Sequence, residues 1–426
     1  MSGNGTADPT RRAFLKHTLM TAAAAAALAP RRAHAKGGAN SALGVGLIGC
    51  GGRSGAHSSS YEWVKSQGLN LNIVAVNDTY RPRMDRMAKR YKAKGYMDHR
   101  ELLADPNVDV VSIATPDHAH GYQAMDAVKA GKDVYCEKPV THWRQFELTK
   151  ALAAAVRESG RVFQLGSQAM SDPAWQKMGD LIREGLIGQP IHAECGYFRV
   201  GDWGEAGMRI DDENAQPGPD LDWDAFLGDA PKVPFTVSRY FQWRMYKDYS
   251  GGPVTDLFPH SLTPTMAMLG LGMPERVVAV GGMYRYTNRE VPDTCNALIE
   301  YPNGMVVALM GTQGNNYQGA GERGAGGRVP VIRGWDGTLT LEGNEVVFIP
   351  AEGSKKEPQR FPFEGQEDTA EYFKSFIEHC IAGNPDTLSG MDLAFKVQTA
   401  LQMAALSQME NKTYLFDKET VTIGPA

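Results

Sequence analysis

Cysteine is scarce in this chain, and the cysteines are not arranged as a disulfide framework. There are five in 426 residues, widely spaced, and no two of them form a Cys-x-x-Cys motif. An odd and scattered set of this kind argues against stabilisation by disulfides. The chain must instead bury apolar cores, and its length suits two domains of ordinary size.

Strong net charge and long apolar segments are also absent from the sequence. The net charge is −5, from 44 basic and 49 acidic residues, so a nucleic-acid partner is not expected. The apolar run from Leu19 to Leu28 is shorter than the roughly 20 residues that a membrane-spanning helix needs. We therefore expect no permanent membrane span.

The amino terminus has the features of an export signal. Thr10 to Lys16 resembles a twin-arginine motif, the apolar run follows it, and Ala33 to Ala35 has the small residues of a cleavage site. We predict a signal peptide over residues 1–35, recognition by the twin-arginine export machinery, and a periplasmic mature protein. This route carries folded proteins, so a cofactor can be loaded before export.

Two different patterns follow along the chain. From residue 42 to 167, apolar strands alternate with helices, which predicts an amino-terminal Rossmann domain with a doubly wound parallel sheet. From residue 168 to 426, turns join most strands, which predicts a carboxyl-terminal α/β domain with a large, mostly antiparallel open sheet. We expect that sheet to pair with another subunit, giving a homo-oligomer. Residues 319–327 are interpreted as a glycine-rich loop, and the helices expected at 368–381 and 391–408 as packing back on the first domain.

A glycine cluster follows the first predicted strand. Gly49 and Gly51 lie where a missing Cβ lets the backbone turn and approach a pyrophosphate, and the next helix directs its amino terminus at the phosphate charge. Ser54 replaces the third glycine of the usual pattern. Asp78 ends the second strand and can accept hydrogen bonds from an adenosine ribose. Its charge favours NAD over NADP, whereas Arg81 could clamp a 2′-phosphate.

Two further motifs lie at the carboxyl ends of predicted strands, where sheets of this kind bind ligands. One runs from Thr115 to His120, and the other is Glu137-Lys138-Pro139. A lysine that points into the cleft can polarise a hydroxyl or pass protons, and a surface lysine is the alternative. His118 and His120 do not share a helix face and have no third ligand, so we expect no metal site. One of these histidines contacting the cofactor or a helix cap is the preferred interpretation.

Asp256 and His260 form the remaining pair of chemical interest. If a helix begins near Thr255, the two residues stand on one face of it. An imidazole beside a carboxylate can take a proton from a substrate hydroxyl. A core histidine satisfied by a nearby acid is the alternative interpretation.

Together these motifs resemble the glucose–fructose oxidoreductase/inositol dehydrogenase/MocA family, in order from the first strand to the carboxyl end. The resemblance implies a nicotinamide cofactor, with Lys138, Asp256 and His260 as the catalytic set. The residues expected to bind the cofactor are Gly49, Gly51, Gly52, Arg53, Asp78, Arg81, Thr115, Pro116, His118, His120, Glu137 and Lys138. Aromatic and cationic groups suit the wall of a sugar site, and the candidates are Trp203, Arg244, Tyr246 and Tyr249.

Export restricts the reaction further, because free NAD is not expected in the periplasm. We therefore predict a sugar or polyol oxidoreductase that keeps NAD tightly bound and regenerates it without release. The alternative is an NAD-dependent glycosidase that oxidises, eliminates and re-reduces a sugar. Tyr197 resembles a tyrosine of that class, but Arg199 stands where its pattern continues with a histidine. A scaffold that holds nucleotide without turnover is disfavoured, because Lys138 and His260 are both present.

Overall fold

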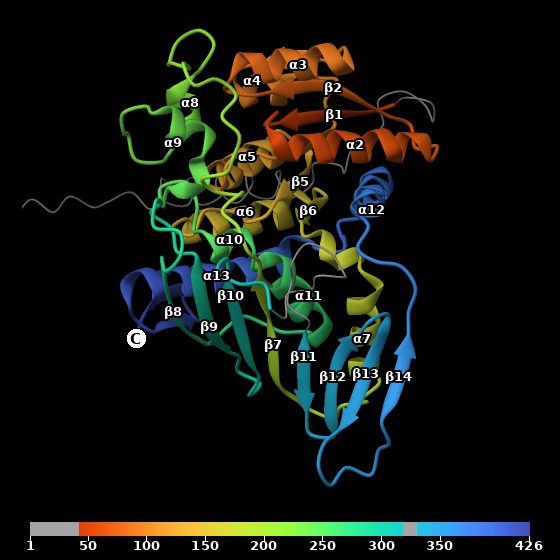
Figure 1. The fold of residues 1–426 in the computed structure, drawn as a ribbon. Helices are drawn as coiled ribbons and strands as arrows, with labels where there is room; N and C mark the ends of the chain where they lie inside the picture. Colours follow the sequence, from red (N-terminus) through yellow and green to blue (C-terminus); the bar gives the residue numbers. More distant parts are fainter. Residues whose placement is uncertain (1–41, 318–329) are drawn as a thin grey trace, which may run out of the picture.

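The computed structural model describes residues 42–317 and 330–426, and two sheets dominate it (Figure 1). The predicted signal peptide and the predicted glycine-rich loop lie outside the described residues. Within the described part of the chain, no helix has the length and apolar character to cross a membrane.

The first sheet has six strands, all parallel, in the order β3-β2-β1-β4-β5-β6. Its strands are β1 (Leu43–Ile48), β2 (Leu71–Asn77), β3 (Lys94–Tyr96), β4 (Val110–Ile113), β5 (Asp133–Glu137) and β6 (Phe163–Gly166). Helices α2 (Gly52–Ser66), α3 (Arg81–Tyr91), α4 (His99–Ala104), α5 (Asp117–Lys129) and α6 (Phe146–Ser159) connect them. Every residue of β1 and β4 is buried, as expected for a parallel sheet that is covered on both faces. The predicted Rossmann topology is confirmed, and the strand order reverses between β1 and β4, where such sheets bind ligands.

The second sheet has ten strands in the order β14-β13-β12-β11-β7-β10-β9-β8-β15-β16. They are β7 (Pro190–Phe198), β8 (Arg276–Gly282), β9 (Thr294–Glu300), β10 (Val306–Thr312), β11 (Val331–Gly334), β12 (Gly337–Glu342), β13 (Glu345–Pro350), β14 (Gln359–Pro362), β15 (Tyr414–Asp417) and β16 (Thr422–Pro425). Only the central β7–β10 pair is parallel. The predicted large, mostly antiparallel sheet is confirmed. Strands β12 and β13 form a hairpin, because the chain turns at Gly343 with φ +58°.

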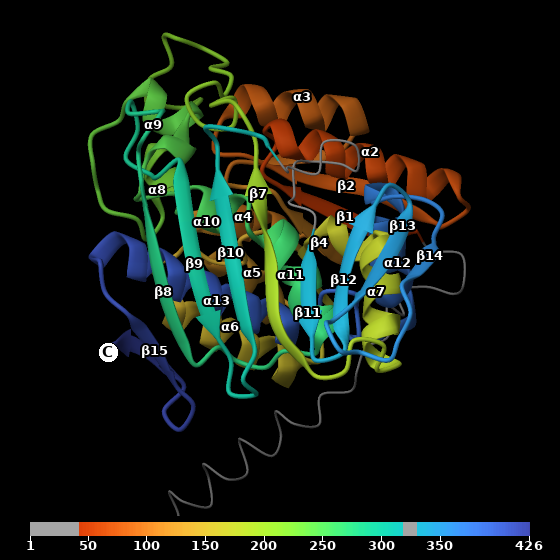
Figure 2. The same ribbon diagram turned by 60° about the horizontal axis from the view of Figure 1, so that its bottom comes forward.

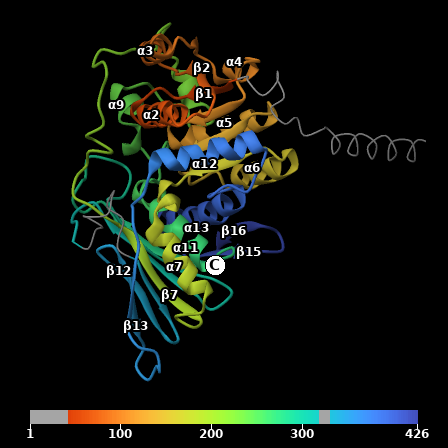
Figure 3. The same ribbon diagram turned by 90° about the vertical axis from the view of Figure 1, so that its right-hand side faces the viewer.

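Three helices fill the space between the second sheet and the Rossmann domain (Figures 1 and 3). They are α7 (Pro173–Arg183), α11 (Pro259–Leu269) and α13 (Met391–Glu410). Leu262 of α11 and Leu401 of α13 lie in one buried cluster with Val307 of the sheet. The other face of the sheet carries Val278 opposite Leu298, and Val280 at 62% exposure, with no described helix covering them (Figure 2).

Helix α12 (Thr369–Ala382) ties the carboxyl-terminal part of the chain to the Rossmann domain. Its Phe373 stacks on Tyr135 of β5 at 4.2 Å, and the rings of His57 and Tyr61 of α2 lie 5.0 Å from it. All four side chains are fully buried. This aromatic cluster fixes α12 across the sheet behind the site described below.

Removing the Phe373 ring tests how much this cluster stabilises the protein. Phe373→Ala leaves a cavity among three rings, so the free energy of unfolding should fall by about 3–5 kcal/mol. The measurement is urea unfolding followed by circular dichroism. Lys374→Ala, on the solvent side of the same helix, is the matched control and should change it by less than about 0.5 kcal/mol. Equal effects of the two variants would contradict the assignment.

Candidate active site

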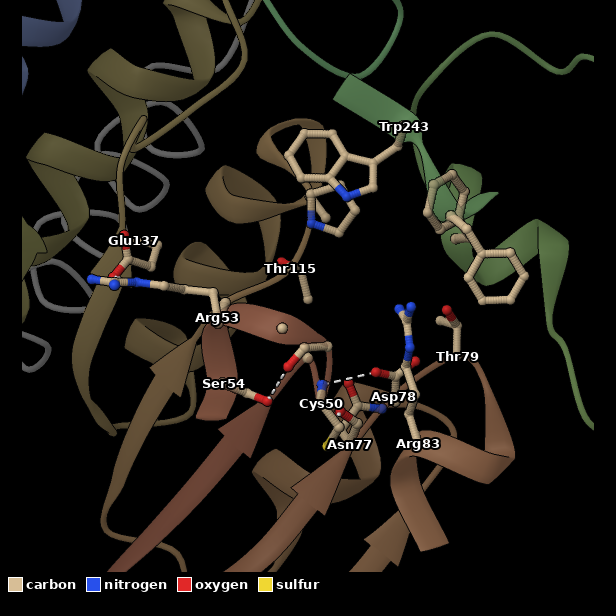
Figure 4. A pocket seen from close by; sticks show the side chains of 18 of the residues that line it. Cys50, Arg53, Ser54, Asn77, Asp78, Thr79, Arg83, Thr115, Glu137 and Trp243 are labelled. Carbon is tan, nitrogen blue, oxygen red and sulfur yellow. Dashed lines mark hydrogen bonds and ion pairs between the residues drawn. The ribbon is translucent and has the colours of Figure 1, made fainter. Parts of the chain in front are cut away.

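A cavity of about 790 Å³ opens at the carboxyl ends of the parallel strands (Figure 4). The Rossmann domain lines one side of it and the carboxyl-terminal part of the chain lines the other. The predicted site residues that line it are Gly49, Gly51, Gly52, Arg53, Asp78, Thr115, Pro116, His120, Glu137, Lys138, Arg244 and His260. Most of the residues proposed from separate motifs therefore converge on one cavity.

The glycine turn is shaped to receive a phosphate group. Gly49 has φ +88°, and a Cβ there would lie 2.8 Å from the Ala114 carbonyl oxygen, so only glycine fits. A Cβ on Gly52 would meet no protein atom, so the space beside it is open to a ligand. Helix α2 starts at Gly52 with no side-chain cap and no acid in its first turn, which leaves its positive end facing the cavity. Ser54, in place of a third glycine, donates to the Gly51 carbonyl at 2.7 Å and closes the turn (Figure 4).

Asp78 is held rigidly at the end of β2. Its carboxylate accepts hydrogen bonds from the amides of Cys50 at 2.8 Å and Tyr80 at 2.9 Å (Figure 4). Burial raises the pKa of Asp78, while Arg83 and Arg86 oppose that shift. Each oxygen has a second lone pair, so the side chain stays available to the hydroxyls of a ribose.

Arg81 does not line the cavity, contrary to its predicted role. Its Nε lies 3.0 Å from Asp220, and its amide donates to the Asp220 carbonyl, because the segment after β2 pairs with residues from the second half of the chain. Arg83, two residues further on, takes the place beside Asp78 (Figure 4). Its Nε donates to Asp211 at 2.6 Å, and its guanidinium stacks on Phe241 at 5.1 Å.

Glu137 anchors the opposite end of the glycine turn. It accepts from Arg53 Nε at 2.8 Å and from Gln168 at 3.1 Å, and His57 Nε2 lies 2.9 Å away (Figure 4). Burial alone would raise the pKa of Glu137, but Arg53 and His57 hold it well below its usual range. His57 escaped the sequence analysis, since a single histidine inside a helix carries no motif.

The two histidines of the Thr115 to His120 motif have different places. His120 lies with Nε2 2.7 Å from the Thr115 carbonyl and Nδ1 2.7 Å from the Pro139 carbonyl, so it ties together the two strand-end motifs. His118 points away from the cavity, with Nε2 2.7 Å from the Phe226 carbonyl and its ring 4.9 Å from Tyr249. His118 does not line the cavity, and its ring packs on Phe226 and Tyr249, so the structure does not support the predicted cofactor contact.

Lys138 joins the two halves of the cavity. Its Nζ donates to the Asp256 carboxylate at 2.8 Å and also to the Asp256 main-chain carbonyl, and both side chains are 9% exposed. Arg244 Nε lies 3.2 Å from the same carboxylate oxygen. Burial alone would raise the pKa of Asp256, but Arg244 and Lys138 hold it far below its usual range.

His260 lines the cavity beside this ion pair. Burial and the charge of Lys138 lower the pKa of His260 to about 3, with Asp256 opposing the shift, so the imidazole is neutral at physiological pH. The ring centre of Tyr197 lies 6.1 Å from that of His260, and burial raises the pKa of Tyr197 to about 12.

The predicted helix that carries both Asp256 and His260 is not formed. The chain makes two short helices, α10 (Pro253–Asp256) and α11, each with a proline in its first turn. Proline supplies no amide hydrogen and is favoured in the first turn of a helix, so Pro259 starts a new helix after α10 has ended. Asp256 consequently bonds to Lys138, and its carboxylate orients the lysine in place of the histidine.

The predicted substrate wall is only partly right. Arg244 lines the cavity, and its neighbour Trp243, which the sequence analysis missed, lines it as well (Figure 4). Tyr249 is fully buried against the rings of His118 and Phe226. Tyr246 packs under Arg239 at 4.4 Å. Trp203 is 65% exposed and packs on Arg199 at 4.3 Å, away from the cavity. Tyr246 and Tyr249 therefore pack the segment that follows Arg244, where both lie against Arg239.

Asp117 is a buried acid of this region that the sequence analysis did not include among the site residues. It starts helix α5, is 1% exposed, and its Oδ2 has no hydrogen-bond partner among the described residues. Burial raises the pKa of Asp117 to about 7, with Arg244 opposing and Asp256 adding to the shift. An acid with this pKa exchanges a proton near physiological pH, directly beside the Lys138–Asp256 pair.

This two-domain architecture, with a dinucleotide-type phosphate turn facing a buried lysine, defines a class of nucleotide-dependent enzymes. Models of one family match the chain twice. Residues 43–167 match "Oxidoreductase family, NAD-binding Rossmann fold", and residues 225–339 match "GFO/IDH/MocA C-terminal domain". Together the matches span more than half of the chain, which belongs to the Gfo/Idh/MocA family of NAD-binding oxidoreductases.

Named relatives act on sugars and polyols. Over 121 residues the chain is 34% identical to scyllo-inositol 2-dehydrogenase (NAD(+)) of Bacillus subtilis, covering 28% of this chain and 35% of that protein. It is 28% identical to levoglucosan dehydrogenase of Pseudarthrobacter phenanthrenivorans over 302 residues, which are 65% of this chain and 70% of that protein. With the Bacillus subtilis protein YrbE the match is 30% identical and covers 34% of this chain. The chain thus spans only 41% and 35% of the length of the two Bacillus relatives.

Solved structures agree with this fold. A levoglucosan dehydrogenase in complex with NADH and levoglucosan superposes with a TM-score of 0.66 at 20% identity, covering 88% of this chain and 99% of that one. GenD2 from gentamicin A biosynthesis, in complex with NAD, gives a TM-score of 0.63 at 21% identity and covers 87% and 95% of the two chains. At these identities the likeness establishes the fold alone.

Replacing Asp117 tests its proton chemistry through stability. The unfolded acid titrates near pH 4 and the folded acid near pH 7, so the folded wild type loses stability as the pH rises between these values. Asp117→Asn removes that loss. Its stability relative to the wild type should rise by roughly 1.4 kcal/mol per pH unit from pH 4 to 7 and then level off. Thermal unfolding of both proteins across pH 4–8 measures this difference in stability. A difference that does not change with pH would contradict the raised pKa of Asp117.

Proposed function

We propose that this protein is a sugar or polyol oxidoreductase that transfers hydride between a substrate carbon and a tightly bound NAD(H). The observation that carries the proposal is Lys138, held by Asp256 inside the cavity and facing the phosphate turn. A lysine fixed in this way serves a substrate hydroxyl, not the solvent. The sugar and inositol dehydrogenases among the relatives support the substrate class.

The residues of the cavity fit the proposed cofactor. Gly49 to Arg53 would hold its pyrophosphate on the amino terminus of α2, and Asp78 would hold the adenosine ribose. The negative charge of Asp78 favours NAD over NADP. NAD, when bound, supplies the hydride acceptor.

Lys138 and His260 divide the proton work on the substrate hydroxyl. The ammonium has three donors, two of which go to Asp256, so one is left for the substrate oxygen. This hydrogen bond and the positive charge stabilise the oxygen as its proton leaves. The neutral imidazole of His260 is the group that can accept that proton.

Tight retention of the cofactor is supported by the segment between β7 and α10, residues 199–252, which we call the strap. Its helices α8 (Trp223–Leu227) and α9 (Val237–Phe241) lie beside α3 over the adenosine end of the cleft (Figure 1). Tyr240 shares a 2.8 Å hydrogen bond with Thr79, and Asp211 holds Arg83. Met208 and Phe241 of this strap line the cavity as well. A nucleotide under the strap is released only when these contacts open.

Export to the periplasm by the twin-arginine machinery remains part of the proposal, from the motif between Thr10 and Lys16. Fractionation of the host cells would test it, and a purely cytoplasmic protein would contradict it.

Homo-oligomerisation is supported by the uncovered apolar side chains Val278, Val280 and Leu298 on the second sheet. Light scattering that gives the mass of a single chain would contradict this part.

The glycosidase alternative has less support. Tyr197 is near His260, but Arg199, where a histidine would stand, is paired with the buried Glu205 at 3.2 Å. Cleavage of a nitrophenyl glycoside, dependent on bound NAD, would favour the glycosidase over the oxidoreductase.

Substitution of Lys138 tests the catalytic assignment. Lys138→Met keeps most of the side-chain volume but removes the donor, so kcat should fall by about 10²–10⁴-fold, while the bound nucleotide is retained. Substrate-dependent absorbance change at 340 nm measures turnover. Lys129→Met, at the exposed end of α5, is the matched control. A Lys138→Met protein with full turnover would contradict the role.

Substitution of Asp211 tests the strap. Asp211→Ala frees Arg83 and removes a partly buried ion pair, so bound nucleotide should exchange roughly tenfold faster. The exchange of bound NAD for an isotopically labelled form measures this rate. Glu213→Ala, two residues further along the same exposed segment, serves as control. Equal exchange in both variants would mean that the strap does not retain the cofactor.

A further inference from the structure

Two cations in the cavity, one buried and one partly buried, share the carboxylate of Asp256. Lys138 and Arg244 both approach Oδ1 of Asp256, at 2.8 Å and 3.2 Å, so their nitrogens lie within about 6 Å of each other. Lys138 is 9% exposed and Arg244 is 26% exposed, and both line the cavity. Asp256 alone does not balance both cations, and the Nε of Arg244 has no hydrogen-bond partner among the described residues, so part of the positive charge at this end of the site is unmatched, which is costly away from water.

The neighbouring charged network does not supply the missing anion. Arg199 and Arg289 lie close by, but they are matched by two acids of their own. Glu205 lies 3.2 Å from Arg199 and 3.3 Å from Arg289, and Asp202 lies 2.8 Å from Arg289. This group is balanced within itself.

Among the remaining neighbours, Glu137 is already paired with Arg53 at 2.8 Å, and Asp117 supplies negative charge only in part. His260 is neutral, as its lowered pKa of about 3 requires. Asp117 carries a proton for part of the time at physiological pH, because burial raises its pKa to about 7. Arg244 stacks on Trp243 at 4.4 Å, which fixes the guanidinium in place without adding a negative charge.

We infer that the substrate itself provides this charge and that it is a sugar acid, whose hydroxyl lies at Lys138 and whose carboxylate is bound by Arg244. Guanidinium groups suit carboxylates because their donors form a fork of matching geometry. A spacing within about 6 Å between the two cations matches a hydroxyl and a carboxylate on one small sugar. The inference rests on the proposed oxidoreductase function and adds the substrate class to it.

Binding to the intact holoenzyme tests the inference. Galacturonate, its neutral methyl ester and galactose form a matched series, and glucuronate, its methyl ester and glucose form a second. Calorimetric titration at pH 6.5 should give at least tenfold tighter binding of the acid than of either neutral partner in one series or both. Arg244→Met should abolish the preference by weakening the acid at least tenfold and the neutral sugars less than threefold. Arg360→Met, at an exposed ion pair of β14, should leave the preference unchanged.

Several outcomes would overturn the inference. They are equal binding of acids and neutral sugars, equal weakening of all ligands by Arg244→Met, and binding of no compound in either series. Reduction of the bound cofactor by neutral sugars alone would overturn the substrate class but leave the oxidoreductase standing. A holoenzyme whose 340 nm absorbance responds to no hydroxyl compound would instead remove the proposed function itself.

Discussion

The ion pair between Lys138 and Asp256 is the interaction on which the site depends. Lys138 lies just past the end of β5 in the Rossmann domain, and Asp256 ends the short helix α10 in the second half of the chain. The pair is buried, so its desolvation is repaid only by close contact and by the further hydrogen bond to the Asp256 carbonyl. It therefore fixes how the two halves meet, and with them the cavity into which His260 and Arg244 project.

The second half of the chain also covers the cofactor cleft of the Rossmann domain. Its strap covers the cleft beside α3, and Asp211 and Tyr240 hold Arg83 and Thr79 on the Rossmann side. The cofactor cleft of the Rossmann domain is thus completed by residues more than 120 positions away in sequence. Closure of this kind suits a protein that must keep one nucleotide through repeated cycles.

The sequence predicted the parts of this structure that have local causes. Gly49 was found because a tight turn at positive φ tolerates only glycine, and the parallel strands because fully buried strands are uniformly apolar. Lys138 was found because a charged residue at a strand end next to proline is conspicuous.

The features that the sequence did not predict depend on contacts between residues that are distant in the chain. Arg81 was named and Arg83 was overlooked, because only contacts with the strap determine which arginine faces the cleft. The aromatic residues around Arg244 were misassigned since an exposed wall and a buried cluster have the same composition.

The nucleotide content of the purified protein tests the central claim most directly. The protein is purified without added cofactor and denatured, and the released small molecules are identified by mass spectrometry. The account predicts close to one NAD(H) for each chain. A preparation with no nucleotide, and with no binding of NAD on titration, would contradict it.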